Sequence, residues 1–360
     1  MSDERPTWLL PTPARRDEPV AGAGLRALLL RLMRGENLNR AEAASLLDAL
    51  LEESATDAQI AGALVALALK GETVEELTGM AEAMRARAVR LRTRHERFID
   101  TAGTGSSAAK TFNVSTAAAF VIAGAGLPVA KHGSRAATSR SGSADVLAAL
   151  GVGVAAAPAV SQKCLDELGI CFMFAPLYHG ATARVAGVRR QLGVHTTFNL
   201  LGPLTNPAGA PRQIIGVWHA SLVEPLARTL AALDTERAWV VHGRDGLDEI
   251  TVGDKTLVAE ASGGEVRAFE IAPEDFGLAR AGLEALRGGD AEMNARIIRS
   301  VLAGERHDAA RALVCANAAG ALYVGGAAES LREAAELSAR SIDSGAALDK
   351  LRRLVEATNA

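Results

Sequence analysis

The stretch from Phe98 to Val152, FIDTAGTGSSAAKTFNVSTAAAFVIAGAGLPVAKHGSRAATSRSGSADVLAALGV, decides the fold. It contains two short apolar runs, Phe98–Thr101 and Leu127–Ala130, and each of them predicts a buried strand. Each run leads into a loop rich in glycine, hydroxyl and basic residues, and each loop leads into a helix pattern. Because the N-terminus of a helix binds anions through its free N–H groups, the stretch predicts two successive phosphate-binding turns on one parallel sheet.

Neither loop carries a common nucleotide-binding motif. The sequence contains no G-x-x-x-x-G-K-[ST], and Gly105 is followed by Ser-Ser-Ala-Ala-Lys, which excludes G-x-G-x-x-G. Two such loops suit a ligand with two separated phosphate groups, such as a sugar with a phosphate at one end and a diphosphate at the other.

The motifs of this stretch resemble those of the anthranilate phosphoribosyltransferase family, within the glycosyltransferase family 3 and nucleoside phosphorylase-like superfamily. GTGSSAAKTFNVSTAAAF and AKHGSRAATSRSGSADVLAALGV are similar to the two substrate loops of that family. Later segments that are also similar include CFMFAPLYHGATARVAGVRRQLGVHTTFNLLGPLTNPA, VVHGRDGLDEIT, ANAAGALYVGG and IDSGAALDKL. The resemblance extends from Gly24 to the C-terminus.

The resemblance implies an enzyme that transfers the phosphoribosyl group of 5-phosphoribosyl 1-pyrophosphate (PRPP) to the amine of anthranilate, in tryptophan biosynthesis. It also implies Mg²⁺ as a cofactor and a homodimer. Two alternatives stay open. One is a pyrimidine-nucleoside phosphorylase-like enzyme, in which Lys110 would bind phosphate. The other is a non-catalytic nucleic-acid-binding relative, although 39 basic against 42 acidic residues argue against the basic surface that it needs.

The same resemblance assigns residues to each ligand. The expected PRPP-binding residues are Gly103, Gly105, Ser106, Ser107, Thr111, Asn113, Val114, Ser115, Thr116, Lys131, Ser139 and Ser143. The expected anthranilate-binding residues are Gly103, His132, Ser134, His179 and Arg189. The expected Mg²⁺ ligands are Ser115, Asp248 and Glu249, and adjacent carboxylates are oxygen ligands of the kind that this cation prefers. No residue is assigned as a general acid or base, because an arylamine is already nucleophilic.

Two positions depart from the family pattern. Ser107 stands where the family commonly has the acid of G-T-G-G-D, and Ser134 stands where it commonly has the amide of K-H-G-N. A hydroxyl group can hydrogen-bond a phosphate, but it supplies no negative charge to Mg²⁺.

The whole chain is expected to form a flexible tail and two domains. Residues 1–22 are the tail. Residues 23–95 and 176–207 form a small all-helical domain, which the resemblance assigns to dimerisation. Residues 96–175 and 208–360 form a larger α/β domain that binds the phosphoribosyl donor, with a mainly parallel central sheet flanked by helices.

Local signals place the elements. Four helices are expected between residues 25 and 94, and polar caps three residues before an acid or amide are predicted at Asn39, Thr56, Thr73 and Ser221. Further strands are expected at Ile170–Phe174, Ile214–Trp218 and Trp239–His242, followed by antiparallel edge strands between residues 249 and 271.

Composition narrows the class of protein. A chain of 360 residues with 49% hydrophobic content can bury a large core, and a net charge of -3 gives no field for nucleic acid or anionic lipid. Cys164, Cys171 and Cys315 show no metal-binding spacing, which suits a reducing compartment. No apolar segment is long enough to span a bilayer, and the first residues lack the apolar core of a signal peptide. We therefore expect a cytoplasmic enzyme of small-molecule substrates, without nucleic-acid or membrane partners.

Overall fold

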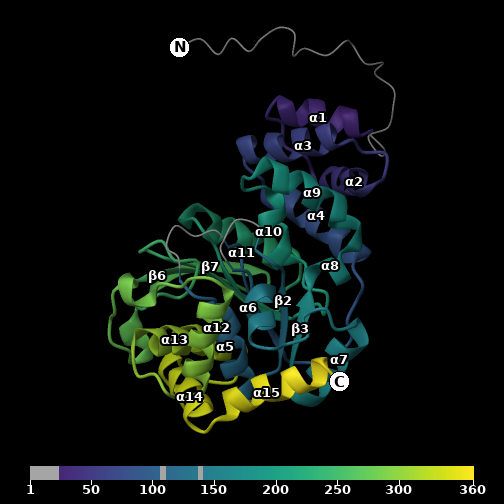
Figure 1. Ribbon diagram of the computed structural model, residues 1–360. Helices are drawn as coiled ribbons and strands as arrows, with labels where there is room; N and C mark the ends of the chain where they lie inside the picture. The colour runs from purple at the N-terminus through teal and green to yellow at the C-terminus, as the bar shows by residue number, and fades with distance from the viewer. Residues whose placement is uncertain (1–23, 106–110, 137–140) are drawn as a thin grey trace.

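The computed structural model describes residues 24–105, 111–136 and 141–360, and a helical part lies against a part built around a sheet (Figure 1). The sheet has seven strands in the order β3-β2-β1-β4-β5-β6-β7. Strands β1 to β5 are parallel to one another, and β6 is antiparallel to both β5 and β7. The strands are β1 (Ile99–Gly103), β2 (Val129–Gly133), β3 (Ile170–Phe174), β4 (Arg212–Gly216), β5 (Arg237–Gly243), β6 (Thr256–Ser262) and β7 (Glu265–Ile271).

The strand order reverses at β1. The chain adds β2 and β3 on one side of β1 and then crosses to add β4 on the other side. In sheets of this kind, ligands bind in the crevice outside the carboxyl ends of the strands where the order reverses. The predicted mainly parallel sheet is confirmed, and its topology points to the ends of β1 and β4.

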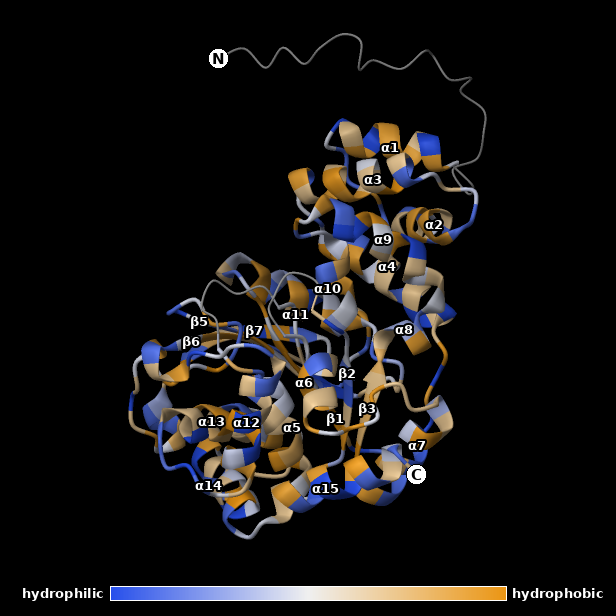
Figure 2. Cartoon of the chain, in the orientation of Figure 1, coloured by the Kyte–Doolittle hydropathy of each residue, from blue (hydrophilic) through white to orange (hydrophobic). Residues whose placement is uncertain are grey.

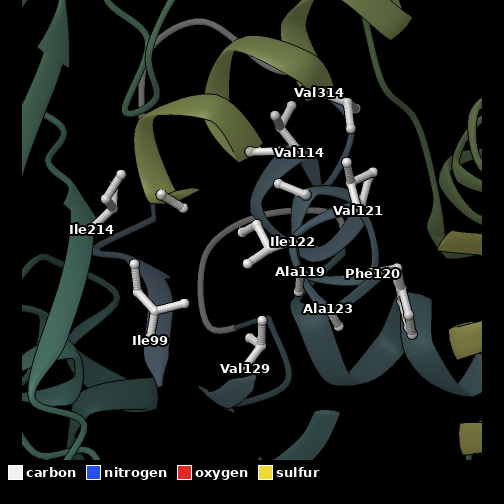
Figure 3. Close-up of a cluster of buried hydrophobic side chains, with 14 of the residues drawn as sticks. Ile99, Val114, Ala119, Phe120, Val121, Ile122, Ala123, Val129, Ile214 and Val314 are labelled. Atoms are coloured by element: carbon white, nitrogen blue, oxygen red, sulfur yellow. The ribbon is translucent and has the colours of Figure 1, made fainter. Parts of the chain in front are cut away.

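Helices cover both faces of the sheet. On one face, α5 packs against β1, β2 and β3, and α13 packs against β4 and β5, whereas α11 packs against β5, β6 and β7 on the other face. Figure 3 shows Ile99 and Val129 of the strands in one apolar cluster with Ile122 of α5. The helices are α5 (Val114–Gly124), α6 (Ser143–Ala149), α7 (Pro158–Leu168), α11 (Val223–Ala232), α12 (Ala291–Leu302), α13 (Ala309–Val324), α14 (Leu331–Asp343) and α15 (Ala346–Thr358).

The helical part combines the N-terminal helices with the mid-chain insertion. In the insertion, α9 packs on α2 and α3, and α10 packs on α3 and α4 (Figure 1). This packing confirms that the insertion returns to the N-terminal helices. The helices are α1 (Leu25–Met33), α2 (Arg40–Leu51), α3 (Asp57–Lys70), α4 (Val74–Arg87), α8 (Ala175–Tyr178), α9 (Ala183–Leu192) and α10 (Thr197–Leu204).

The predicted caps are confirmed in three of four cases. Asn39, Thr56 and Thr73 each form a capping box. The predicted cap at Ser221 is wrong, because residues 220–222 form a 3-10 turn in which the His219 side chain accepts the Ser221 N–H. Further 3-10 turns are Gly180–Thr182, Pro273–Phe276 and Leu283–Leu286.

One apolar core crosses between the two parts. Buried side chains of α1–α4, α9 and α10 form a single cluster with α11 and with one face of the sheet. Neighbouring strand residues alternate between the two clusters: Ile215 and Val240 belong to this one, whereas Ile214 and Trp239 belong to the other. The predicted tail, residues 1–22, lies outside the described residues. Within those residues, no helix is both long and apolar enough to cross a membrane.

A buried carboxylate joins three segments of the helical part. The Glu76 side chain has no exposed surface, and it accepts hydrogen bonds from the Leu38 N–H, 2.9 Å away, and from the Thr73 N–H, 2.8 Å away. Its other contact is an ion pair of 2.8 Å with the Lys70 ammonium. Removal of one partner from a buried ion pair leaves the other charge uncompensated.

We predict that Glu76→Ala lowers the free energy of unfolding by about 3 to 5 kcal/mol, because Lys70 and two N–H groups lose their partner. Urea denaturation followed by circular dichroism measures this. The control is Gln59→Ala, which removes the equivalent side chain from the exposed capping box of α3 and should cost less than about 1 kcal/mol. Equal losses in both variants would contradict a special role for Glu76.

Candidate active site

A cleft of 610 Å³ opens at the carboxyl ends of β1 and β2 and extends to the insertion helices α9 and α10. Fourteen of the predicted site residues line it: Gly103, Gly105, Thr111, Asn113, Ser115, Thr116, Lys131, His132, Ser134, Ser143, His179, Arg189, Asp248 and Glu249. The Val114 side chain instead lies in the core, where Figure 3 labels it, and its N–H donates to the Phe112 carbonyl. Ser106, Ser107 and Ser139, together with Lys110, lie outside the described residues.

The donor end of the cleft is built around the start of α5. Asn113 is the N-cap residue, but its side chain makes no capping hydrogen bond. Its amide instead donates to the Ser141 carbonyl, 3.2 Å away, and accepts from the Asn294 amide of α12, 3.0 Å away. Asn113 therefore fixes the loop before α6 to the start of α5, and the two predicted phosphate-binding turns face the same cleft.

The predicted metal ligands lie together beside this end. The Ser115 N–H donates to the Glu249 carboxylate over 3.2 Å, and the Ser115 hydroxyl lies 3.4 Å from the Lys131 ammonium. Burial, followed by the negative charge of Asp248, raises the pKa of Glu249 to about 8. A cation would relieve this crowding of negative charge, so the oxygen donors of the set fit Mg²⁺.

The predicted metal ligands include only two carboxylates, Asp248 and Glu249, which is fewer than in a metal centre built from acidic side chains alone. No group of three or more His, Cys, Asp or Glu side chains in the described part of the chain could hold a metal ion. A cation here would combine the two carboxylates with the Ser115 hydroxyl and with oxygen atoms of a ligand, as is usual for Mg²⁺ at phosphate sites.

Two contacts hold the acidic segment in place. A Cβ atom at Gly216, the last residue of β4, would lie 1.7 Å from the Asp248 carbonyl oxygen, so only glycine allows the segment to cross the strand end. On the other side, the buried Asn317 amide of α13 accepts the Ile250 N–H over 2.9 Å and donates to the Ile250 carbonyl over 2.8 Å. Both contacts fix the backbone on which Asp248 and Glu249 stand.

The acceptor end contains two neutral imidazoles. His132 Nδ1 lies 3.2 Å from the Gly202 carbonyl and therefore carries the proton, and Nε2 has no partner among the described residues. Burial, together with His179, lowers the pKa of His132 to about 3. The His179 ring lies 5.1 Å away, and its Nε2 contacts the Thr205 carbonyl. The His132 ring thus lines the cleft with an Nε2 lone pair that receives no hydrogen bond from the described residues.

Asp100, which is fully buried, connects β1 to both sides of the acceptor end. One carboxylate oxygen accepts the His132 N–H over 3.2 Å, and the other accepts the Asn206 amide over 2.7 Å. Asn206 also donates to the Ala130 carbonyl. Burial raises the pKa of Asp100 to about 6. The strand that carries His132 is therefore tied to the segment that follows α10.

Arg189 reaches the cleft from α9. Its guanidinium donates to the Thr196 hydroxyl and to the Asn199 amide oxygen, each over 3.1 Å, and it lies 5.6 Å from the centre of the Phe198 ring. Burial lowers the pKa of Arg189. No carboxylate of residues 24–105, 111–136 or 141–360 forms an ion pair with it. A half-buried cation with only neutral partners is suited to bind an anionic ligand.

Sequence reasoning missed the polar side chains that hold the site residues. These are Asp100, Thr196, Asn199, Asn206, Asn294 and Asn317. The first and the last stand inside apolar runs, FID and VCANAAG, where a polar residue must find a partner if it is buried. That signal was present in the sequence, although it does not name the partner.

Comparison with known proteins identifies the family. The model of a glycosyl transferase family, a/b domain, matches residues 95–348, and that of the helical bundle domain of a glycosyl transferase family matches residues 26–88. Anthranilate phosphoribosyltransferase from Moorella thermoacetica is 51% identical over 331 residues, which cover 92% of this chain and 97% of the relative. The chain belongs to the anthranilate phosphoribosyltransferase family. The resemblance noted in its motifs is confirmed.

Other members of the anthranilate phosphoribosyltransferase family are similar to this chain over a comparable length. The enzyme from Rubrobacter xylanophilus is 52% identical, and the aligned residues cover 92% of this chain and 96% of the Rubrobacter chain. The crystal structure from Thermus thermophilus has 42% identity and a TM-score of 0.87, and it covers 92% of this chain and 99% of that chain. The Saccharomyces cerevisiae structure in complex with PRPP and Mg has 27% identity and a TM-score of 0.84, with coverages of 93% and 98%.

We predict that Gly216→Ala keeps the fold but lowers Mg²⁺-dependent activity by about a hundredfold, because the added methyl group displaces the Asp248–Glu249 backbone. The measurement is the rate as a function of Mg²⁺ concentration, with circular dichroism to check folding. Gly187→Ala is the control, since a Cβ there meets nothing within 4 Å. A Gly216→Ala enzyme with the wild-type Mg²⁺ dependence would show that the segment can shift without loss.

Proposed function

We propose that this chain transfers the phosphoribosyl group of PRPP to the amine of anthranilate and releases diphosphate, as a step of tryptophan biosynthesis. The observation that carries the proposal is the pairing of two ends in one cleft. One end has glycine-rich turns and the start of α5, and elsewhere the same cleft is lined by the neutral His132 imidazole and the Arg189 guanidinium. Anthranilate carries both an amine and a carboxylate, which these two side chains can bind.

The donor half of the reaction needs charge stabilisation. As the bond from C1 of the ribose to the diphosphate breaks, positive charge develops on the sugar and negative charge on the leaving group. Lys131, a buried residue that lines the cleft, would contribute positive charge near that leaving group. Mg²⁺, which Ser115, Asp248 and Glu249 would hold, supplies further neutralisation of the diphosphate when bound. The Saccharomyces cerevisiae complex with PRPP and Mg supports this assignment.

The acceptor half of the reaction needs orientation more than proton abstraction. His132, with its pKa lowered to about 3, is a weak base, but its Nε2 lone pair can accept one N–H of the amine and aim the nitrogen lone pair at the ribose. Arg189 would bind the carboxylate at the other end of the acceptor. Two contacts on one planar molecule fix both its position and its rotation.

The alternatives receive less support. The names of the relatives favour a phosphoribosyltransferase over a nucleoside phosphorylase. The nucleic-acid-binding alternative lacks a basic surplus in the chain, whose net charge is -3. Buried thiols at Cys164, Cys171 and Cys315, in place of disulfides, fit the reducing cytoplasm that we propose as its location.

The direct test uses the purified chain with PRPP, anthranilate and Mg²⁺. Loss of anthranilate fluorescence together with release of diphosphate is expected, and both should stop when the metal is chelated. If PRPP is not consumed in the presence of anthranilate, the proposal fails. Replacement of anthranilate by a pyrimidine nucleoside plus phosphate tests the phosphorylase alternative in the same assay.

Arg189→Ala should raise the KM for anthranilate by roughly ten- to a hundredfold and leave the KM for PRPP nearly unchanged, because a charge-assisted hydrogen bond contributes about 1.5 to 3 kcal/mol. Initial rates at varied concentrations of each substrate give both constants. Arg184→Ala on the same helix, which removes an exposed ion pair with Asp57, should change neither by more than about twofold. Equal effects on both substrates would assign Arg189 a structural role.

We also propose a homodimer that forms through the helical part. Leu30, Met33, Val65 and Leu69 of α1 and α3 are exposed apolar side chains, and Leu69 is 84% exposed. Figure 2 shows apolar segments along both helices. Apolar side chains that gather on one exposed surface mark protein interaction sites.

Leu69→Glu should convert the dimer into a monomer at micromolar concentration, because burial of the new carboxylate in an apolar interface is unfavourable. Light scattering after size-exclusion chromatography measures the mass. Met293→Glu, at an exposed apolar residue of α12, should leave the mass unchanged. A wild-type protein that is monomeric, or a Leu69→Glu protein that stays dimeric, contradicts this interface.

A further inference from the structure

We propose that Thr196 and Asn199 are positioning residues that hold the Arg189 guanidinium at the cleft through neutral atoms, so that its charge stays available for the carboxylate of the acceptor. The inference rests on the proposed function, because it assigns Arg189 an anionic partner. The inference goes beyond the proposed function because it identifies the neutral contacts of Arg189 as the feature that selects an anionic acceptor.

The contacts form one compact unit at the start of α10. Thr196 is the N-cap residue and Asn199 is the third residue of the capping box. The Asn199 amide oxygen accepts the Thr196 N–H over 3.0 Å and the Arg189 Nη2 over 3.1 Å. The Thr196 hydroxyl accepts the Arg189 Nε over 3.1 Å. The Asn199 side chain therefore both caps the helix and orients the guanidinium, and the Thr196 hydroxyl supplies the second acceptor for the guanidinium.

Orientation by two acceptors leaves little freedom. Hydrogen bonds at both Nε and Nη2 fix the guanidinium plane, and the Phe198 ring lies 5.6 Å from it. Arg189 and Asn199 both line the cleft. A planar donor fixed in this way can meet a carboxylate with its remaining N–H groups without a further loss of side-chain entropy.

A related arrangement joins α1 and α2, although the Nε of its arginine bonds a second carboxylate, Glu36, in place of the N-cap side chain. At the junction of α1 and α2, Arg31 lies near the end of one helix and contacts Glu42, the third residue of the next capping box. There the partner is a carboxylate, the two groups form an ion pair of 2.5 Å, and the hydrogen bond to Glu42 raises the pKa of Arg31. At the junction of α9 and α10 the partner is an amide, and burial lowers the pKa of Arg189.

This comparison separates the two tasks of the capping box. A carboxylate at its third position can accept the N-cap N–H as well as an amide does, as Glu42 shows with the Asn39 N–H at 3.0 Å. A carboxylate would, however, neutralise the arginine. The amide of Asn199 supplies the capping contact and the orientation and leaves the positive charge uncompensated, which is the property that an anion-binding site needs.

The test is Asn199→Asp, which changes an amide into a carboxylate of the same shape. Calorimetry without turnover measures the binding of two probes, anthranilate and 2-aminobenzamide, which has a neutral amide in place of the carboxylate. We expect anthranilate to bind about ten- to a hundredfold more weakly, because the introduced carboxylate would pair with Arg189, and 2-aminobenzamide to change by less than about twofold. The KM for PRPP should also stay within about twofold.

The matched control is Gln59→Glu, the same amide-to-carboxylate change at the third position of the capping box of α3. It should leave the affinity for both probes unchanged. A second pair of variants covers the case in which Asn199→Asp does not fold: Thr196→Val removes the acceptor of the Arg189 Nε and should weaken anthranilate binding severalfold, whereas Thr196→Ser should restore it.

The outcomes are distinct. Equal weakening of both probes, or an unchanged affinity for anthranilate in a folded Asn199→Asp protein, overturns the inference. Wild-type protein that binds anthranilate but does not turn it over with PRPP contradicts the proposed function and leaves the binding comparison valid. Wild-type protein that binds neither probe overturns both.

Discussion

The buried carboxylate of Asp100 is the interaction on which the cleft depends. It lies in the first strand of the sheet and receives hydrogen bonds from the His132 backbone and from Asn206, which follows the helical insertion. Burial of this carboxylate is unfavourable, as its pKa of about 6 indicates, and the two hydrogen bonds offset part of that cost. Through one side chain, the strand ends that form the donor site are held in register with the helices that form the acceptor site.

Charge is divided between the two ends of the cleft. The carboxyl groups of Asp248 and Glu249 lie beside the start of α5, where a phosphate-bound cation would be held, and burial together with Asp248 raises the pKa of Glu249 to about 8. The acceptor end has the opposite character, with a positive guanidinium and two imidazoles that are neutral because they are buried. The carboxylate of an acceptor such as anthranilate is therefore attracted to the guanidinium end of the cleft, whereas a diphosphate would bind at the other end together with its Mg²⁺.

Much of the fold could be predicted from the sequence because its signals are local. The caps at Asn39, Thr56 and Thr73 and the strand Ile170–Phe174 depend on residues within a few positions of one another. The cap at Ser221 failed because the side chain of His219, two residues before it, contacts both the N–H and the hydroxyl of Ser221 in a 3-10 turn. The contacts that hold the site are long-range: Asn317 lies 67 residues from Ile250, and Asn294 lies 181 residues from Asn113. No local pattern encodes such pairs, so only motif similarity could indicate their neighbourhood.

The apolar cluster that joins α1–α4 to α11 and to one face of the sheet has a consequence for cooperativity. A helical bundle that has a separate hydrophobic core can unfold independently of the rest of the protein, and it can rotate about a hinge as a rigid body. Here α4 packs on α11, so separation of the bundle from the sheet would expose apolar side chains of the shared cluster to water, and each buried side chain of Leu or Met size contributes about 1.5 to 3 kcal/mol. Unfolding of the helical part is therefore coupled to unfolding of the sheet through this shared cluster.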